Sequence, residues 1–272
     1  MQNIKDKVVI ITGGSSGIGF ALAREFGIQG AKIVISARSI DRLTEAENKL
    51  KSEGIDVIAV SADVSKEADC INLIEKAAAH FGKIDILVNN AGISMRAAFV
   101  NTSPDVLRKL METNFWGTVY CTKQALPYLL KTKGSVVGII SIAGYVGLPG
   151  RTGYSASKFA VRGFLDTLRC ENLKTGLHVL VAAPGFTSSN IRTTALTADG
   201  SPQGETPRDE ARMMSANVAA KKIVKATIRR KDALTLTLIE GKFTVLLNRF
   251  FPKLVSRLAY YYMSKEPDSP FK

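Results

Sequence analysis

One short stretch near the start of the chain decides the fold: ITGGSSGIGFA at residues 11–21. It places Gly13, Gly17 and Gly19 between an apolar run, Val8 to Thr12, and a segment with helical spacing, Phe20 to Gln29. Glycine lets the backbone turn tightly and approach a phosphate closely, at a helix N-terminus whose free N–H groups favour negative charge. The spacing is G-x-x-x-G-x-G and not the generic dinucleotide-binding G-x-G-x-x-G, so an ordinary glycine-rich turn is the alternative interpretation.

Beyond this stretch, apolar runs alternate with segments of helical periodicity. We expect strands at residues 8–12, 32–36, 57–61, 86–88, 135–141, 178–183 and 233–239, and helices at 20–29, 41–52, 67–81, 104–131, 154–173 and 217–231. Such alternation predicts βαβ units and therefore an α/β fold, a parallel sheet covered by helices on both faces. We expect one doubly wound domain over residues 1–240 and a helical tail over 241–272 that is not an independent domain. The polar segment 188–210 is expected to be a mobile loop or lid.

Composition argues against several kinds of site. The 272 residues, 46% of them hydrophobic, suit one large core. Three scattered cysteines (Cys70, Cys121 and Cys170) and two histidines (His80 and His178) lack metal-ligand spacing, so we expect no metal and no histidine-based hydrolytic site. Because we find no leader and no apolar run of spanning length, we expect a cytoplasmic protein in a reducing compartment.

The formal net charge of +13 is consistent with three kinds of binding partner: a nucleic acid, an anionic membrane surface, or a phosphorylated cofactor. Residues 217–272 hold 12 Lys and Arg against 4 Asp and Glu, so most of the excess belongs to the tail. There the basic residues interleave with apolar ones, and no known nucleic-acid motif is present. We therefore expect no nucleic-acid partner.

A phenol and an ammonium lie four residues apart in TGYSASKFAVRGF, residues 152–164. In a helix Tyr154 and Lys158 share one face and can meet side by side. A free phenol has a pKa of about 10, and a nearby cation favours the phenolate and lowers that pKa. The pair predicts a proton-exchanging site, although a packed aromatic residue and an exposed lysine are the plainer alternatives.

Six motifs together carry a family resemblance: TGGSSGIG (12–19), NNAG (89–92), Asn114, Ser141, YSASK (154–158) and PG (184–185). In this order they resemble the short-chain dehydrogenase/reductase family, over about residues 5–190. The resemblance implies a Rossmann-type domain with a mostly seven-stranded sheet, a nicotinamide cofactor, and a homodimer or homotetramer built on the two long helices.

The same resemblance implies roles for four catalytic residues. Tyr154 would donate a proton to the developing alkoxide during carbonyl reduction, and Ser141 would hold that oxygen. Lys158 would bind the ribose of the nicotinamide nucleotide, and Asn114 would hold a water that relays protons. Singly, each of the four has a structural explanation; jointly, the spacing favours catalysis.

The end of the second strand indicates which cofactor is used. Ala37 stands where an NAD site carries an acid, and Arg38 beside it can pair with a 2′-phosphate, so we predict NADP(H). A solvated surface arginine is the alternative. By resemblance, Asp63 and Val64 contact adenine, and Ser189 stands where the family commonly has threonine. The expected cofactor contacts are Gly13, Ser15, Ser16, Gly17, Ile18, Gly19, Arg38, Asp63, Val64, Asn90, Ala91, Gly92, Tyr154, Lys158, Pro184, Gly185, Thr187 and Ser189.

Three segments are expected to set substrate choice: residues 94–99, 142–152 and 186–215. They are largely apolar, which favours a lipophilic ketone, and they offer no dedicated arginine cluster for a thioester carrier, although Arg96 or Arg151 could serve. The alternatives are a 3-oxoacyl or small polar carbonyl substrate, or a non-catalytic NADP-binding scaffold. A scaffold would predict a damaged Tyr/Lys/Ser set.

The tail segment GKFTVLLNRFFPKLVSRLAYYYM, residues 241–263, mixes apolar and basic residues, and Pro252 divides it into two short helices. It either packs on the domain or across a dimer, or lies in a membrane surface as a peripheral anchor. Together with GYSASKFAVRGF the tail resembles the 3-ketosphinganine reductases and, more loosely, membrane-associated hydroxysteroid dehydrogenases.

Overall fold

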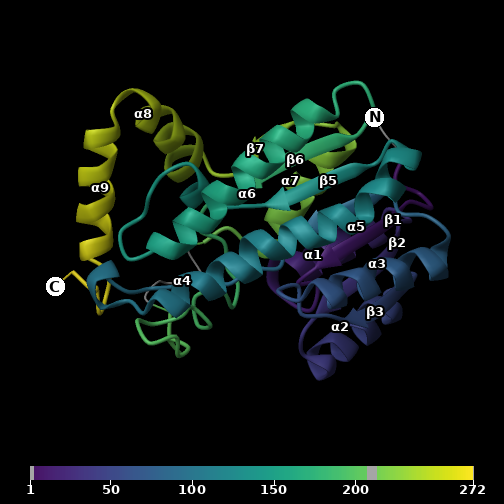
Figure 1. Cartoon of the computed structure of the whole chain (residues 1–272), viewed down its shortest axis with the longest axis horizontal. Helices are drawn as coiled ribbons and strands as arrows, with labels where there is room; N and C mark the ends of the chain where they lie inside the picture. Colours follow the sequence, from purple (N-terminus) through teal and green to yellow (C-terminus); the bar gives the residue numbers. More distant parts are fainter. Residues whose placement is uncertain (1–2, 207–212, 272) are drawn as a thin grey trace.

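The computed structural model describes residues 3–206 and 213–271, and a parallel sheet forms its centre (Figure 1). Its seven strands are β1 (Val8–Thr12), β2 (Lys32–Ala37), β3 (Val57–Ser61), β4 (Ile86–Asn89), β5 (Ser135–Ile139), β6 (His178–Ala183) and β7 (Ala233–Thr235). They are ordered β3-β2-β1-β4-β5-β6-β7, and every neighbouring pair is parallel. The predicted seven-stranded α/β fold is confirmed.

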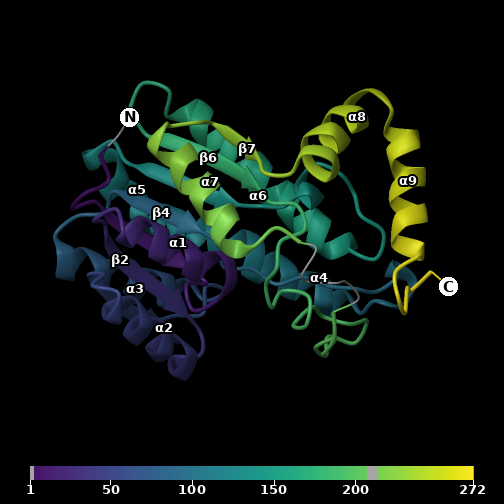
Figure 2. The same cartoon turned by 180° about the vertical axis from the view of Figure 1, so that it is seen from behind.

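Helices cover both faces of this sheet (Figures 1 and 2). They are α1 (Gly17–Gly27), α2 (Ile40–Ser52), α3 (Glu67–Phe81), α4 (Pro104–Leu110), α5 (Gly117–Thr132), α6 (Thr152–Glu171), α7 (Ala216–Ile228), α8 (Thr244–Phe250) and α9 (Pro252–Ser264). Short 3-10 turns, η1 (Phe99–Asn101) and η3 (Ile142–Gly144), and two π-helical segments, η2 (Met111–Trp116) and η5 (Leu238–Phe243), complete the described elements.

The core follows from the two-residue period of the strands. In β1, Val9 and Ile11 pack with α1, α2 and α7, whereas Ile10 faces the opposite layer of α3, α5 and α6. All five residues of β1 are buried, as are all six of β6. A parallel strand covered on both sides needs apolar side chains in both directions, which is why these strands appear as continuous apolar runs in the sequence.

The order of the strands places a crevice beside β1. From β1 the chain builds outward through β2 and β3, and then crosses to β4 on the other side. In such sheets the loops at the carboxyl ends of the two central strands separate and leave room for a ligand. The glycine stretch that follows β1 and the Asn90 region that follows β4 therefore meet at one place.

Two predicted elements differ from the structure. The helix expected at 104–131 is interrupted by η2, where the Asn114 side chain makes tertiary contacts, consistent with the frequent use of π segments at functional sites. The strand expected at 233–239 ends at Thr235, so its second half is wrong. There Gly241 folds back onto Thr237, and a Cβ on Gly241 would lie 2.6 Å from the hydroxyl oxygen of Thr237.

The C-terminal segment stands beside the domain as a pair of helices, α8 and α9 (Figure 1, yellow). Pro252 is the first residue of α9, a position at which its missing N–H costs nothing. The predicted division at this proline is confirmed. Many large apolar side chains of this segment are exposed, among them Phe250 at 65% and Phe251 at 59%. Among the described residues, none of the helices combines the length and apolar character that crossing a membrane requires.

A buried carboxylate ties the beginnings of β1 and β4 together. Asp85 accepts hydrogen bonds from Lys7 Nζ at 2.9 Å and from the Val8 backbone N–H at 2.9 Å. Lys83 Nζ lies 3.2 Å from its other oxygen. Burial alone would raise the pKa of Asp85, but these donors together hold it below its usual range.

We predict that Asp85→Asn destabilises the protein by about 3 kcal/mol at pH 7, because two lysines lose their buried partner. Since the folded state lowers the pKa of Asp85, its stabilisation is present at neutral pH and is lost as the pH falls below about 4. Urea unfolding of both proteins at pH 7 and pH 3 measures this. A difference that does not shrink at pH 3 would contradict the assignment.

Candidate active site

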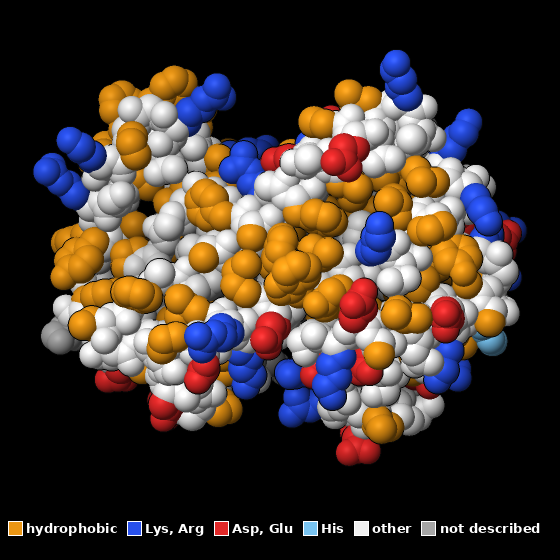
Figure 3. Space-filling model, in the orientation of Figure 1, with side chains coloured by type: hydrophobic (Ala, Val, Ile, Leu, Met, Phe, Trp, Pro, Cys, Tyr) orange, Lys and Arg blue, Asp and Glu red, His pale blue; other side chains and the backbone are white. Residues whose placement is uncertain are grey.

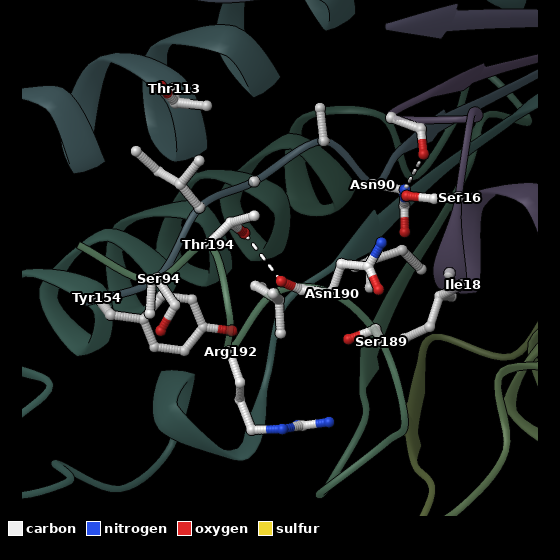
Figure 4. Close-up of a pocket in the computed structure, with 18 of the residues that line it drawn as sticks. Ser16, Ile18, Asn90, Ser94, Thr113, Tyr154, Ser189, Asn190, Arg192 and Thr194 are labelled. Carbon is white, nitrogen blue, oxygen red and sulfur yellow. Dashed lines mark hydrogen bonds between the residues drawn. The ribbon is translucent and has the colours of Figure 1, made fainter. Parts of the chain in front are cut away.

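The predicted site residues converge on one cavity of about 870 Å³ at the carboxyl ends of the central strands (Figure 4). Every expected cofactor contact except Gly19 lines it, and so does Ser141. Gly19 lies behind the lining, against the glycine loop. Asn114 is also behind the lining, buried at 1% exposure.

The glycine loop is shaped as a cradle for an anion. Gly13 and Gly17 have φ angles of 66° and 54°, which favour glycine. A Cβ on Gly19 would lie 2.1 Å from the carbonyl oxygen of Gly13, so no side chain fits there. Helix α1 begins at Gly17, and no acidic residue stands in its first turn. Its free N–H groups thus face the cavity at a positive helix end, which fits a pyrophosphate.

Asn90 holds this loop from behind. Its side-chain amide donates to the carbonyl oxygens of Thr12 at 2.9 Å and Gly13 at 3.2 Å. In return, the Thr12 hydroxyl accepts the backbone N–H groups of Asn90 and Ala91 at 3.1 and 3.0 Å. These bonds lock the end of β1 to the end of β4, so Asn90 positions the cradle.

The far end of the cavity carries positive charge. Ala37, Arg38 and Arg42 line it together with Asp63 and Val64. Sequence reasoning missed Arg42, which lies in the first turn of α2, four residues after Arg38. Because position 37 carries no carboxylate, the end of β2 has no acid to repel a phosphate on the adenosine ribose.

Helix α6 brings Tyr154 and Lys158 to the opposite end. Lys158 is 4% exposed and donates from Nζ to the Ile139 carbonyl oxygen at 2.9 Å. Its Nζ lies 5.8 Å from the centroid of the Tyr154 ring. Burial lowers the pKa of Lys158 to about 8. The predicted juxtaposition of the two side chains is therefore present.

The expected effect of Lys158 on the phenol differs from what the structure shows. Burial raises the pKa of Tyr154 above its ordinary value, and this outweighs the lowering by a hydrogen bond with Ser141 and by the charges of Arg151 and Arg192. The Lys158 ammonium is directed to the Ile139 carbonyl, and burial disfavours its charged form. Without cofactor, the phenol therefore holds its proton firmly.

Asn114 ties two parts of the site together. Its amide donates to the Ile93 carbonyl oxygen and to Ser157 Oγ, both at 2.9 Å, and its oxygen accepts the Ile93 N–H at 2.8 Å. These contacts join the loop after β4 to α6 one residue before Lys158. The role of Asn114 in holding a water stays a prediction.

The segment after β6 closes the cavity. Pro184, Gly185, Thr187 and Ser189 line it, and a Cβ on Gly17 would lie 3.2 Å from Cβ of Ser189. Further along, Leu196 exchanges backbone hydrogen bonds with Ser94 and Arg96 at 2.8 Å. The described part of the expected lid is thus joined to the loop after β4; residues 207–210 of the expected lid lie outside the described residues.

Of the two arginines named for substrate binding, only Arg151 lines the cavity. Arg96 turns away and pairs with Glu266 at 3.6 Å. Sequence reasoning missed Arg192, which lines the cavity and whose side chain extends away from the Tyr154 ring in Figure 4. No sequence signal marked it, because it belongs to a polar segment without helical or strand periodicity.

Comparison with known proteins agrees with this geometry. The family model described as short chain dehydrogenase matches residues 7–199. Dehydrogenase/reductase SDR family member 7B of Bos taurus is 36% identical over 273 residues, covering 98% of this chain and 84% of the bovine protein. The 11-beta-hydroxysteroid dehydrogenase A of Arachis hypogaea is 38% identical over 283 residues, covering 98% and 79%.

Among solved structures, an alcohol dehydrogenase from the archaeon Thermococcus sibiricus, complexed with 5-hydroxy-NADP, superimposes with a TM-score of 0.74 at 26% identity. It covers 85% of this chain and 94% of the archaeal one. The chain belongs to the short-chain dehydrogenase family, oxidoreductases that use a nicotinamide cofactor. The resemblance drawn from the six motifs is confirmed.

Proposed function

We propose that this protein reduces a lipophilic ketone to a secondary alcohol with NADPH, using Tyr154 as the proton donor. The observation that carries the proposal is the position of the half-buried Tyr154 phenol, with Ser141 and Lys158, in the same cavity as the glycine cradle. A non-catalytic NADP-binding scaffold would have no need to bury the Lys158 ammonium beside the Tyr154 phenol, because burying a charged group is costly. The intact set therefore favours an enzyme.

The protonation state of Tyr154 suits reduction. Burial raises the pKa of the phenol, so at neutral pH the hydroxyl carries its proton and can donate it to an alkoxide oxygen. When bound, the nicotinamide supplies a hydride to the carbonyl carbon. Ser141, which hydrogen-bonds with Tyr154, stands beside the same oxygen and stabilises its developing charge. Lys158, held by Ile139, keeps a positive charge close to the ribose position.

The choice of NADP(H) rests on the basic end of the cavity. Arg38 and Arg42 line the region where the adenosine ribose would lie, and Ala37 removes the acid that an NAD site uses. The archaeal relative in complex with 5-hydroxy-NADP supports the same choice.

The lipophilic substrate rests on the walls beside Tyr154. Ile93, Leu148 and Leu196 line this end of the cavity. The Arachis hypogaea relative is named for action on a hydroxysteroid, which supports an extended apolar ketone. A 3-ketosphinganine-like substrate fits the same walls, and a 3-oxoacyl or small polar carbonyl remains the alternative substrate.

We further propose that residues 1–240 form the catalytic domain and that 241–272 dock on a membrane surface. Exposed apolar residues on α8 and α9 interleave with Arg249, Lys253 and Arg257, and these two helices contain no carboxylate (Figure 3). A second apolar area lies over α5 and α6, where Trp116 and Phe159 are exposed (Figure 3). It supports a homodimer or homotetramer formed through these helices.

We predict that the protein oxidises NADPH with long-chain or steroidal ketones and that Tyr154→Phe lowers turnover by about 100-fold or more, because the proton donor is lost. Absorbance at the NADPH band, with short aliphatic and sugar ketones as comparison, measures turnover. NADPH binding by the variant, followed by calorimetry, is the control for folding. Turnover of small polar carbonyls alone would contradict the lipophilic substrate, and substantial activity in the variant would remove Tyr154 from its role.

A substitution at Arg38 tests the preference for NADPH over NADH. Arg38→Ala should raise the KM for NADPH by roughly tenfold, since a charge-assisted hydrogen bond is lost, and should change the KM for NADH little. Lys51→Ala is the matched control, because it removes an exposed positive charge from α2 that pairs with Glu47. Tighter saturation of the native protein with NADH than with NADPH would overturn the assignment.

Membrane docking predicts binding to vesicles of phosphatidylserine and phosphatidylcholine that weakens as salt is added. Replacing Phe250 and Phe251 by serine should weaken binding strongly, at about 2 kcal/mol per aromatic side chain. Phe99→Ser is the control, since Phe99 is 63% exposed but lies outside the tail. Co-sedimentation measures the bound fraction. Binding to duplex or single-stranded nucleic acid without binding to vesicles would support the nucleic-acid interpretation instead.

A further inference from the structure

We propose that Arg96 and Glu266 are positioning residues for the ketone site, because their buried ion pair lets the C-terminal segment fix the wall of the cavity beside Tyr154. The inference rests on the proposed function and deepens it, since it names residues that determine how tightly the ketone binds. Both residues belong to the described part of the chain, and neither lines the cavity. Their influence on the ketone therefore passes through the loops that they hold.

The ion pair joins two segments that are remote in the chain. Arg96 Nε lies 3.6 Å from Glu266 Oε2, and the two side chains are only 7% and 6% exposed. Arg96 also donates from Nη2 to the Pro267 carbonyl oxygen. The end of the chain, marked C in Figure 1, thus returns to the loop after β4. Removing either partner of a buried ion pair leaves a charge unpaired, so the pair favours one arrangement of the two segments.

Arg96 lies in the segment that builds a small apolar cluster beside Tyr154. Its neighbours Met95 and Ala97 are buried in this cluster together with Leu196, and Tyr154 packs against it. The backbone N–H of Arg96 donates to the Leu196 carbonyl oxygen at 2.8 Å. While Met95 and Ala97 pack into the cluster, the Arg96 side chain between them pairs with the C-terminal segment. The ion pair therefore holds this part of the wall from outside the cluster.

The tail also holds the loop before α6 at two places. In α8, Asn248 donates from Nδ2 to the Tyr145 carbonyl oxygen at 3.3 Å. Near the end of the chain, Pro270 lies against Gly150, since a Cβ on Gly150 would be 3.4 Å from Cγ of Pro270. The Gly150 carbonyl oxygen in turn accepts the Ala97 N–H at 3.1 Å. The loop after β4 and the loop before α6 are thus held against each other and against the tail.

These contacts act on the ketone end of the cavity and leave the cofactor end to other bonds. Ser94, Leu148 and Leu196, which belong to the held loops or bond with them, line the cavity. The glycine cradle is fixed separately, by the hydrogen bonds of Asn90. A displaced wall loses contact with the apolar body of the ketone, which does not change between ground state and transition state. Loss of such uniform binding raises the KM for the ketone and leaves kcat nearly unchanged.

Neutral replacements in the full chain test the inference with the ketone that the native protein reduces fastest. Arg96→Gln and Glu266→Gln should each raise the KM for this ketone by roughly tenfold, since misplacing a contact by about 1 Å has effects of this size or more. The KM for NADPH and kcat should both stay within about twofold of the native values. Glu266→Gln, near the end of the chain, keeps the test available if Arg96→Gln does not fold.

Arg169→Gln is the matched control. Arg169 is also partly buried, pairs with Asp166 at 2.9 Å and donates to the Val179 carbonyl oxygen, but it lies in the last turn of α6. Its replacement should leave the KM for the ketone unchanged. An unchanged KM in the Arg96 and Glu266 variants would overturn the inference, and so would a KM for NADPH that rises as much as the KM for the ketone.

The double variant shows whether the two residues act as a pair. Arg96→Gln combined with Glu266→Gln should raise the KM for the ketone no further than the larger single effect, because either change breaks the same ion pair. Single effects that multiply in the double variant would mean that the two residues act independently. That result would overturn the inference while leaving the proposed function intact.

Backbone hydrogen exchange, followed by mass spectrometry, keeps the test independent of turnover. In both single variants, peptides that cover residues 93–98 should exchange at least about tenfold faster than in the native protein, whereas peptides that cover residues 10–20 should keep their rate. Equally faster exchange in both regions would indicate a general loss of stability and would overturn the inference. If the native protein reduces no ketone of the panel, the proposed function fails, and selectively faster exchange at residues 93–98 would still support the positioning role.

Discussion

The buried hydrogen bond from Lys158 to the Ile139 carbonyl is the interaction on which the site depends. It fastens α6 to the end of β5, and the two other candidate catalytic residues lie on or next to these two elements. Tyr154 lies one helical turn before Lys158, and Ser141 lies two residues beyond Ile139. Burying an ammonium is costly, which the lowered pKa of Lys158 records, and a carbonyl acceptor at 2.9 Å offsets part of that cost. A residue without this donor would leave the carbonyl unpaired and the helix less firmly placed.

Burial and charge oppose each other at the Tyr154 phenol, and their balance sets the protonation state of this group. Burial favours the neutral hydroxyl, whereas Ser141, Arg151 and Arg192 favour phenolate. Burial is the larger effect, so the group starts as an acid. A cation or an anion that enters the cavity shifts this balance, because charges at close range interact strongly where water is excluded. Cofactor and substrate would therefore act on the proton donor as well as on the carbonyl carbon.

Charge is distributed over the molecule in a way that links the cavity to the tail. Basic side chains line both ends of the cavity, and basic and apolar side chains alternate along α8 and α9. The segment after α9 returns to the substrate end, where Glu266 pairs with Arg96 and a Cβ on Gly150 would lie 3.4 Å from Pro270.

The sequence alone determined the fold and which side chains are the candidates for catalysis, because both depend on local patterns. Apolar runs of strand length mark β1 to β6, and Tyr154 and Lys158 share a helix face at any placement of that helix. The tertiary structure decided those features that depend on contacts between residues far apart in the chain. It shortened β7 where Gly241 folds onto Thr237, raised the pKa of Tyr154 by burial, and brought Arg192 from an irregular segment to the phenol. The burial and the electrostatic environment of a residue depend on neighbours that are remote in the chain. The periodicity of the sequence therefore does not indicate them.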